Sequence, residues 1–156
     1  MKCLVPSLVV TLLSSAIALQ AAEPKAETAP KKQLPLPGDV FLVEGRVAFL
    51  IPATNAKPGQ PKPWVWYAPT LPNLPGKAEE WMFRQFTDAG IAIAGIDVGE
   101  SFGSPNGREL YTKLHTELTG SRGYSQKPVL MGRSRGGLMT LSWAVENVDK
   151  VGGFAG

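Results

Sequence analysis

The sequence predicts an α/β fold with a mostly parallel sheet and helices on both faces. Short apolar runs suited to buried strands alternate with longer segments whose apolar residues recur at helical spacing. Repeated strand–helix–strand units of this length form parallel sheets through right-handed crossovers. The expected buried strands cover residues 64–68, 91–98 and 128–131, and residues 151–155 begin another.

Further strands are expected before these units. Residues 40–51 are apolar and rich in β-branched side chains, with Gly45 among them. This pattern predicts one or two strands with a kink or turn at Glu44-Gly45. Residues 52–63 contain Pro, Asn, Lys, Gly and Gln, and they predict a loop.

Three helices are expected between the buried strands. The first covers about residues 77–89, the second starts at Ser104-Pro105, and the third follows Gly136-Gly137. The residues predicted to face inward are, in order, Ala78, Met82, Phe86 and Ala89; Leu110, Leu114 and Leu118; and Leu138, Leu141, Val145 and Val148.

The first residues are typical of an exported protein. Lys2 precedes an apolar run over residues 3–19, and the small residues Ala21 and Ala22 follow. This pattern predicts a secretory signal peptide over residues 1–22 and a secreted or periplasmic location. A retained membrane anchor is the alternative, while no stable membrane span is expected once the signal is cleaved.

The folded domain is expected to begin after a linker. Residues 23–38 are rich in Pro, Ala and Lys and lack apolar periodicity, which predicts a flexible tether. The domain itself is expected to cover residues 39–156.

Composition argues against several kinds of site. Cys3 is the only cysteine and lies in the predicted signal peptide, so no disulfide or thiolate site is expected in the mature chain. His115 is the only histidine, too few for a histidine metal site, and no cofactor or metal is expected.

The net charge of +3 comes from scattered residues and argues against a nucleic-acid partner. The absence of a glycine-rich phosphate motif disfavours a nucleotide-binding domain. The sequence leaves the oligomeric state open.

One pentapeptide has the pattern of a catalytic motif. Residues 132–136 match G-x-S-x-G, with a buried strand directly before them and an amphipathic helix directly after. A serine in such a tight turn projects its hydroxyl above the sheet, and a Cβ on Gly132 or Gly136 would collide with the backbone. The helix N-terminus also favours a developing negative charge. Ser134 is therefore the predicted nucleophile.

A second match to the pattern covers residues 99–103, also after a strand. Ser104-Pro105-Asn106-Gly107 follows it, so that no helix can start immediately after Gly103. The turn geometry that the motif requires is thereby broken, and Ser134 is favoured over Ser101.

The stretch from about Trp64 to Gly156 resembles the α/β-hydrolase superfamily, in particular its esterase and dipeptidyl-peptidase-like branches. The resemblance implies a partial α/β-hydrolase fold that lacks the C-terminal strands. It also implies an oxyanion hole built from the N–H of Arg135 and a second N–H from the loop 69–73. Since Pro69 and Pro72 have no N–H, the best candidate donors are Thr70 and Leu71. The His-Gly pattern common in relatives is absent from that loop.

The resemblance further implies an acid and a histidine after the nucleophile, and no histidine follows Ser134. His115 precedes it and is expected to be a partly buried helix residue. Glu146 and Asp149 lie at the end of the third helix. We therefore expect an incomplete serine hydrolase for an ester or amide of a small-molecule or peptide acyl substrate, inactive as this truncated chain. The alternative is a non-catalytic secreted binding protein on the same fold.

Overall fold

The computed structural model describes residues 31–56 and 58–156. The predicted signal peptide and the first part of the predicted tether lie outside these residues. None of the helices in the described ranges combines the length and the apolar character that a membrane crossing requires.

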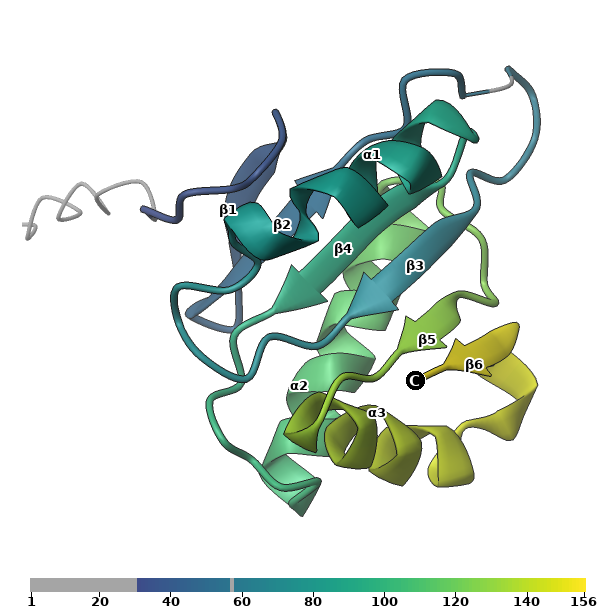
Figure 1. Cartoon of the computed structure of the whole chain (residues 1–156). Coiled ribbons are helices and arrows are strands. Elements are labelled where there is room, and N and C mark those ends of the chain that lie inside the picture. Colours follow the sequence, from purple (N-terminus) through teal and green to yellow (C-terminus); the bar gives the residue numbers. More distant parts are fainter. Residues whose placement is uncertain (1–30, 57) are drawn as a thin grey trace, which may run out of the picture.

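Six strands form one sheet in the order β1-β2-β4-β3-β5-β6 (Figure 1). The strands are β1 (Asp39–Val43), β2 (Arg46–Ile51), β3 (Trp64–Tyr67), β4 (Ala92–Ile96), β5 (Val129–Met131) and β6 (Gly153–Ala155). The last four run parallel to one another, whereas β2 is antiparallel to both β1 and β4. The predicted α/β class with a mostly parallel sheet is confirmed.

The predicted turn at Glu44-Gly45 joins β1 to β2 in a two-residue hairpin, with Val43 paired to Arg46. Both turn residues have positive φ, 49° and 72°, as a type I′ turn requires. Residues 40–51 therefore form two strands.

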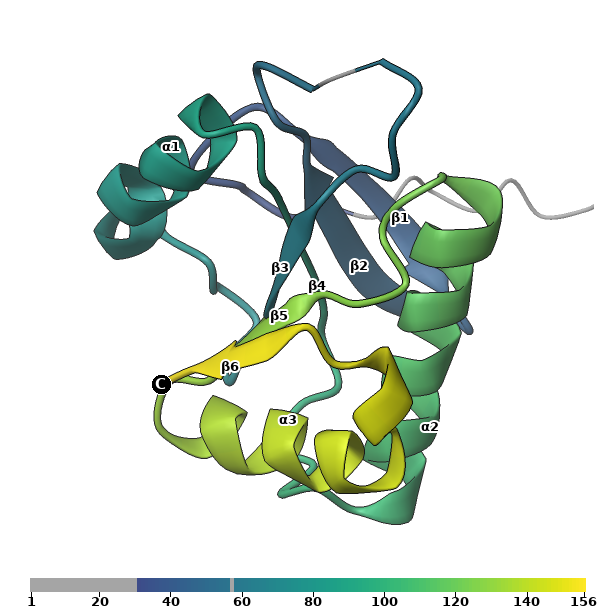
Figure 2. The same cartoon turned by 90° about the vertical axis from the view of Figure 1, so that its right-hand side faces the viewer.

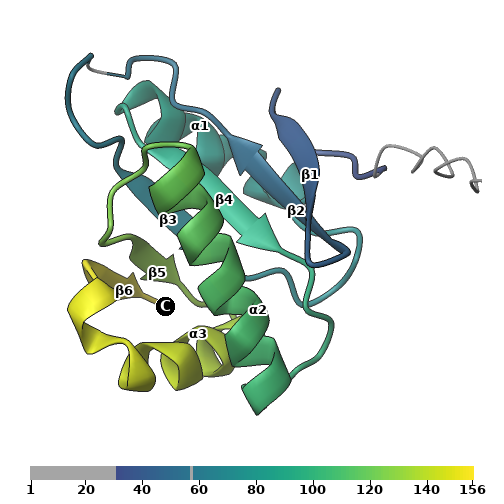
Figure 3. The same ribbon diagram turned by 180° about the vertical axis from the view of Figure 1, so that it is seen from behind.

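Helices cover both faces of the sheet, as predicted (Figure 2). The main helices are α1 (Glu80–Asp88), α2 (Pro105–Thr116) and α3 (Arg135–Glu146). Short turns extend the three helices at η1 (Lys77–Glu79), η2 (Glu117–Ser121) and η3 (Val148–Lys150). The first helix packs on one face, while α2 and α3 share the other, and α2 lies in front of the sheet when the molecule is seen from behind (Figure 3).

The start of α2 follows the sequence prediction. Ser104 is the N-cap, and its hydroxyl oxygen accepts a hydrogen bond from the Gly107 N–H at 3.3 Å. Pro105 occupies the first helical position. The predicted inward-facing residues Leu110, Leu114 and Leu118 are buried.

An aromatic cluster fills the core beneath α2 and α3. Trp66 of β3 is fully buried, with the rings of Tyr111 and Trp143 centred 5.2 and 4.8 Å away. His115 lies over the same indole at 6.4 Å and is itself 4% exposed. Large aromatic surfaces packed in this way dominate the energetics of a small core.

The inward face of α1 differs from the prediction. Ala78 and Ala89 are exposed, and the buried residues of this region are Glu79, Phe83 and Thr87. The predicted Met82 and Phe86 pack at the edge of this core. The buried stripe is one residue off the predicted one because it includes two polar side chains, which carry no hydrophobic signal.

The inward face of α3 was also predicted wrongly. Leu138, Leu141, Val145 and Val148 are exposed, whereas Gly136, Met139, Thr140 and Trp143 are buried. Gly136 has no side chain, so its backbone packs directly on β3. The sheet-facing stripe therefore starts at a glycine and passes through a threonine, neither of which marks an apolar face in a sequence.

The described part of the predicted tether, residues 31–38, is packed rather than flexible. Leu36 is buried, Leu34 packs against the core under α1, and Lys32 forms an ion pair with Asp97. The ordered part of the chain therefore begins before residue 39, the predicted boundary.

The orientation of α3 predicts how substitutions on its two faces act. Val145→Glu should change the free energy of unfolding by about 0.5 kcal/mol or less, because Val145 is 78% exposed. Met139→Ala should cost about 2–5 kcal/mol, because Met139 is buried. Urea denaturation measures both, and a large loss in Val145→Glu would contradict this orientation.

The buried histidine predicts a loss of stability in acid. Burial lowers the pKa of His115, although its ring Nε2 contacts the Gln126 carbonyl oxygen at 2.8 Å. Below about pH 6.5 the unfolded chain takes up a proton that the folded chain resists, so the free energy of unfolding falls as pH falls.

The matched variant is His115→Gln, which does not titrate. The loss between pH 7.5 and pH 5 in urea denaturation should be smaller in this variant than in the parent chain. The difference between the two proteins isolates His115 from carboxyl groups such as Asp97, whose pKa is raised by burial. Equal losses would contradict the assignment.

Candidate active site

Ser134 lies at a sharp corner between β5 and α3. The strand ends at Met131, and the helix begins at Arg135 with Ser134 as its N-cap residue. Ser134 has φ 55° and ψ −131°, a strained conformation for a residue with a side chain. The residue is exposed. The corner has the shape that the G-x-S-x-G pattern predicts.

Two glycines make this corner possible. A Cβ on Gly132 would lie 2.4 Å from the Gly137 Cα, and a Cβ on Gly136 would lie 2.8 Å from the Ala68 carbonyl oxygen. Both distances are far below van der Waals contact. The steric reason given for the two glycines of the motif therefore holds in the structure.

The three backbone N–H groups predicted to form an oxyanion hole have no acceptor within the described ranges. No hydrogen bond is donated by the N–H of Arg135, Thr70 or Leu71 there. Arg135 is the first residue of α3, where a helix leaves its N–H groups unpaired. The groups are therefore free to receive a negatively charged oxygen.

The loop after β3 reaches the corner through Thr70. The Cγ2 atom of Thr70 lies 3.6 Å from the position that a Cβ of Gly136 would take. The contact follows from the sheet order, because β3 and β5 are parallel neighbours whose carboxyl ends meet at one edge. Leu71 is 47% exposed. Thr70 thus lies next to the corner.

The second pentapeptide has a different geometry. The hydroxyl oxygen of Ser101 is buried and has no hydrogen-bond partner among the described residues. Phe102 and Gly103 form a turn with positive φ, in which the Ser104 N–H donates to the Ser101 carbonyl oxygen at 2.9 Å. A helix starts only at Pro105. Ser101 therefore lies in a turn that packs on the start of α2.

His115 lies at the opposite end of the sheet from Ser134. Its Nε2 contacts the carbonyl oxygen of Gln126, which precedes β5, whereas Ser134 follows β5. A strand rises by about 3.3 Å per residue, so the two side chains are separated by the length of β5 and its flanking residues. His115 lies in α2, as expected, but it is buried in the core rather than partly buried.

Both arginines of the pentapeptide pair with carboxylates. The Nη1 atom of Arg133 lies 2.9 Å from Glu79 Oε1, and that of Arg135 lies 2.7 Å from Glu100 Oε1. Glu146 at the end of α3 is likewise paired, with Arg108 at 2.8 Å.

Glu79 is a residue that sequence reasoning missed. Its side chain is 2% exposed, and its second carboxylate oxygen accepts the Gly76 N–H at 2.8 Å. Burial, and then the charge and hydrogen bonding of Glu79, raise the pKa of Tyr67. Glu79 thus joins the segment before α1 to Arg133, the neighbour of Ser134. The only local signal was an acid at a helix start, which is common on surfaces.

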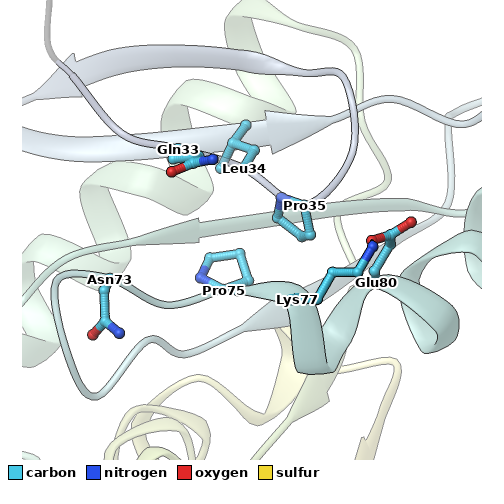
Figure 4. A pocket seen from close by; sticks show the side chains of 8 residues that line it. Gln33, Leu34, Pro35, Asn73, Pro75, Lys77 and Glu80 are labelled. Carbon is cyan, nitrogen blue, oxygen red and sulfur yellow. The ribbon is translucent and has the colours of Figure 1, made fainter.

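A largely apolar cavity of about 390 Å³ opens beside the corner. It is lined by Tyr67, Ala78, Glu79, Met82, Met131, Gly132, Arg133, Ala155 and Gly156. A second cavity of about 450 Å³ lies farther away, between residues 33–35 and the segment that leads into α1 (Figure 4). The described residues contain no cluster of three or more His, Cys, Asp or Glu able to hold a metal ion.

Solved structures share this arrangement. A puromycin-hydrolysing peptidase of Mycobacterium tuberculosis has a TM-score of 0.57 at 17% identity, over 70% of this chain and 21% of the peptidase. Dipeptidyl peptidase 4 of Porphyromonas gingivalis has a TM-score of 0.57 at 11% identity, over 76% of this chain and 20% of the enzyme. The chain has the α/β-hydrolase fold. An esterase/lipase from an uncultured bacterium has a TM-score of 0.53 at 16% identity, over 84% of this chain and 50% of the esterase.

The chain spans about a fifth of the two peptidases and half of the esterase. The resemblance to the α/β-hydrolase fold is thereby confirmed. No model of a protein family matches the sequence, and no curated protein sequence matches it.

The strain at Ser134 predicts that glycine at this position stabilises the fold relative to alanine. A strained φ and ψ pair costs about 1–3 kcal/mol, and glycine removes this cost at an entropic penalty of about 0.5–1 kcal/mol. The free energy of unfolding of Ser134→Gly should therefore be about 1 kcal/mol higher than that of Ser134→Ala, which keeps the strain. Thermal and urea denaturation of the two variants test this, and a less stable glycine variant would contradict the strained corner.

Proposed function

We propose that the chain is the part of a serine hydrolase that carries the nucleophile, and that Ser134 attacks the carbonyl carbon of an ester or amide. The single observation that carries the proposal is the position of Ser134, an exposed residue, at a strained strand-to-helix corner. Solved structures with this fold include serine peptidases and esterases, which supports the hydrolase class.

Two backbone N–H groups are candidates to stabilise the negative charge that develops on the carbonyl oxygen of the substrate. The N–H of Arg135 and the N–H of Thr70 are unpaired and belong to segments in contact with each other, and Leu71 is the alternative second donor. Donors fixed in advance around an oxyanion commonly contribute about a hundredfold or more to turnover. The substrate class is therefore a small-molecule or peptide acyl compound.

A base must still take the proton of the hydroxyl, because a serine alcohol alone is a poor nucleophile. The only histidine in the sequence is His115, which is buried at the other end of β5. We therefore expect the 156-residue polypeptide alone to turn over substrate very slowly. A non-catalytic secreted binding protein on the same fold is the second candidate, which the position of the only histidine away from Ser134 favours.

Chemical rescue separates the two candidates. The chain is treated with a fluorophosphonate probe with and without imidazole, which serves as a diffusible base. Labelling should be slow without imidazole and about tenfold faster with it, a small part of the hundredfold or more that a positioned base supplies. Mass spectrometry identifies the labelled serine.

The matched variants are Ser134→Ala and Ser101→Ala. Labelling should disappear in the first and persist in the second, because the Ser101 hydroxyl is buried. Undiminished labelling of Ser134→Ala would refute Ser134 as the nucleophile. A lack of any imidazole-dependent labelling of the parent chain would favour the binding protein.

A further inference from the structure

Lys32 is a buried cation with three acceptors. Its Nζ donates to both carboxylate oxygens of Asp97, at 2.9 and 2.8 Å, and to the carbonyl oxygen of Pro72 at 3.0 Å. The side chain is 3% exposed. An ammonium group has three donors, and each of them is used here. Burying a charge costs free energy unless it is paired, and Lys32 meets this requirement in full.

The two partner residues of Lys32 come from distant parts of the chain. Pro72 is 40 residues from Lys32, and Asp97 is 65 residues away. Asp97 follows the carboxyl end of β4, and Pro72 lies in the loop between β3 and α1. The same loop carries Thr70 two residues earlier. One side chain therefore connects the N-terminal segment, the sheet edge and the loop beside the corner.

No other hydrogen bond joins residues 31–38 to residues 69–76 in the described ranges. Beyond Lys32 the two segments face each other across the cavity of about 450 Å³, with Leu34 and Pro35 on one side and Asn73 and Pro75 on the other (Figure 4). Leu34 and Leu74 pack against the same apolar cluster, but Lys32 supplies the polar contact that joins segment and loop.

We propose that Lys32 is a positioning residue that holds the loop between β3 and α1, and with it the Thr70 N–H, at the carboxyl edge of the sheet. The inference rests on the proposed function for its effect on reactivity. The loop has no strand partner over residues 69–73, so the Lys32 contact limits how far the Thr70 N–H can move. A misplacement of about 1 Å at a reacting centre can cost about a hundredfold in rate.

The first measurement follows the loop directly. The Leu74 N–H donates to the Leu71 carbonyl oxygen at 3.0 Å, so its hydrogen exchange reports whether the loop is closed. Lys32→Met keeps the length of the side chain and removes its donors. Exchange at Leu74 should become about tenfold faster, while amides in the middle of α2 keep their protection.

The matched control is Lys77→Met. Lys77 lies close to the same loop but is 90% exposed and pairs only with Glu80. Its loss should leave exchange at Leu74 unchanged. If Lys32→Met unfolds because Asp97 is left unpaired, the double variant Lys32→Met/Asp97→Asn replaces it, since it removes both charges together.

The second measurement follows reactivity. Fluorophosphonate labelling with imidazole is resolved into probe binding and the rate of bond formation. Lys32→Met should lower the rate of bond formation about tenfold or more and leave probe binding nearly unchanged, because the lost alignment acts on the oxyanion. A general loss of structure would instead weaken both and would lower protection in α2.

The outcomes are separable. Unchanged exchange at Leu74 in Lys32→Met overturns the positioning role, whatever the labelling shows. Faster exchange with an unchanged rate of bond formation also overturns it. If the parent chain is never labelled, the proposed function fails and the effect on reactivity with it, while exchange at Leu74 still decides whether Lys32 holds the loop.

Discussion

Three backbone segments pack closely around Ser134, and the geometry of the corner and the orientation of α3 depend on this contact. The start of α3 lies so near the end of β5 that a Cβ on Gly132 would collide with Gly137, and a Cβ on Gly136 would collide with the backbone of Ala68, directly after β3. Hydrogen bonds across the turn, such as that from the Gly137 N–H to the Ser134 carbonyl oxygen at 3.0 Å, complete the corner. The strain at Ser134 is tolerated because both flanks are fixed.

This contact also determines which side of α3 meets the sheet. Once Gly136 lies on β3, residues three, four and seven positions later must face the same way. Met139, Thr140 and Trp143 occupy these positions, and Trp143 packs on Trp66 in the aromatic core. The exposed stripe of Leu138, Leu141, Val145 and Val148 is the consequence on the other side. The packing of the corner therefore overrides the hydrophobic pattern.

The sequence predicted those features that have a local signal. Buried strands are apolar runs, and the N-cap of α2 and the glycines of the corner have fixed spacing, so all three were predicted correctly. The inward face of α3 was predicted wrongly, since it begins with a glycine. Lys32 and Glu79 were missed because their partners, Asp97 and Arg133, are 65 and 54 residues away. A charged residue in a Pro-rich segment or at a helix start gives no local sign of burial.

These two buried charges act on the same loop from opposite ends. Lys32 binds the Pro72 carbonyl oxygen, and Glu79 accepts the Gly76 N–H while pairing with Arg133 beside Ser134. A loop without regular structure can present a backbone N–H in a fixed place only if its own polar groups are held. Ion pairs that bury a charge, such as Lys32 or Glu79, add little net stability, because desolvation offsets the attraction, but they do fix geometry. Their concentration at the carboxyl edge is therefore better explained by alignment of the loop with the corner than by stability.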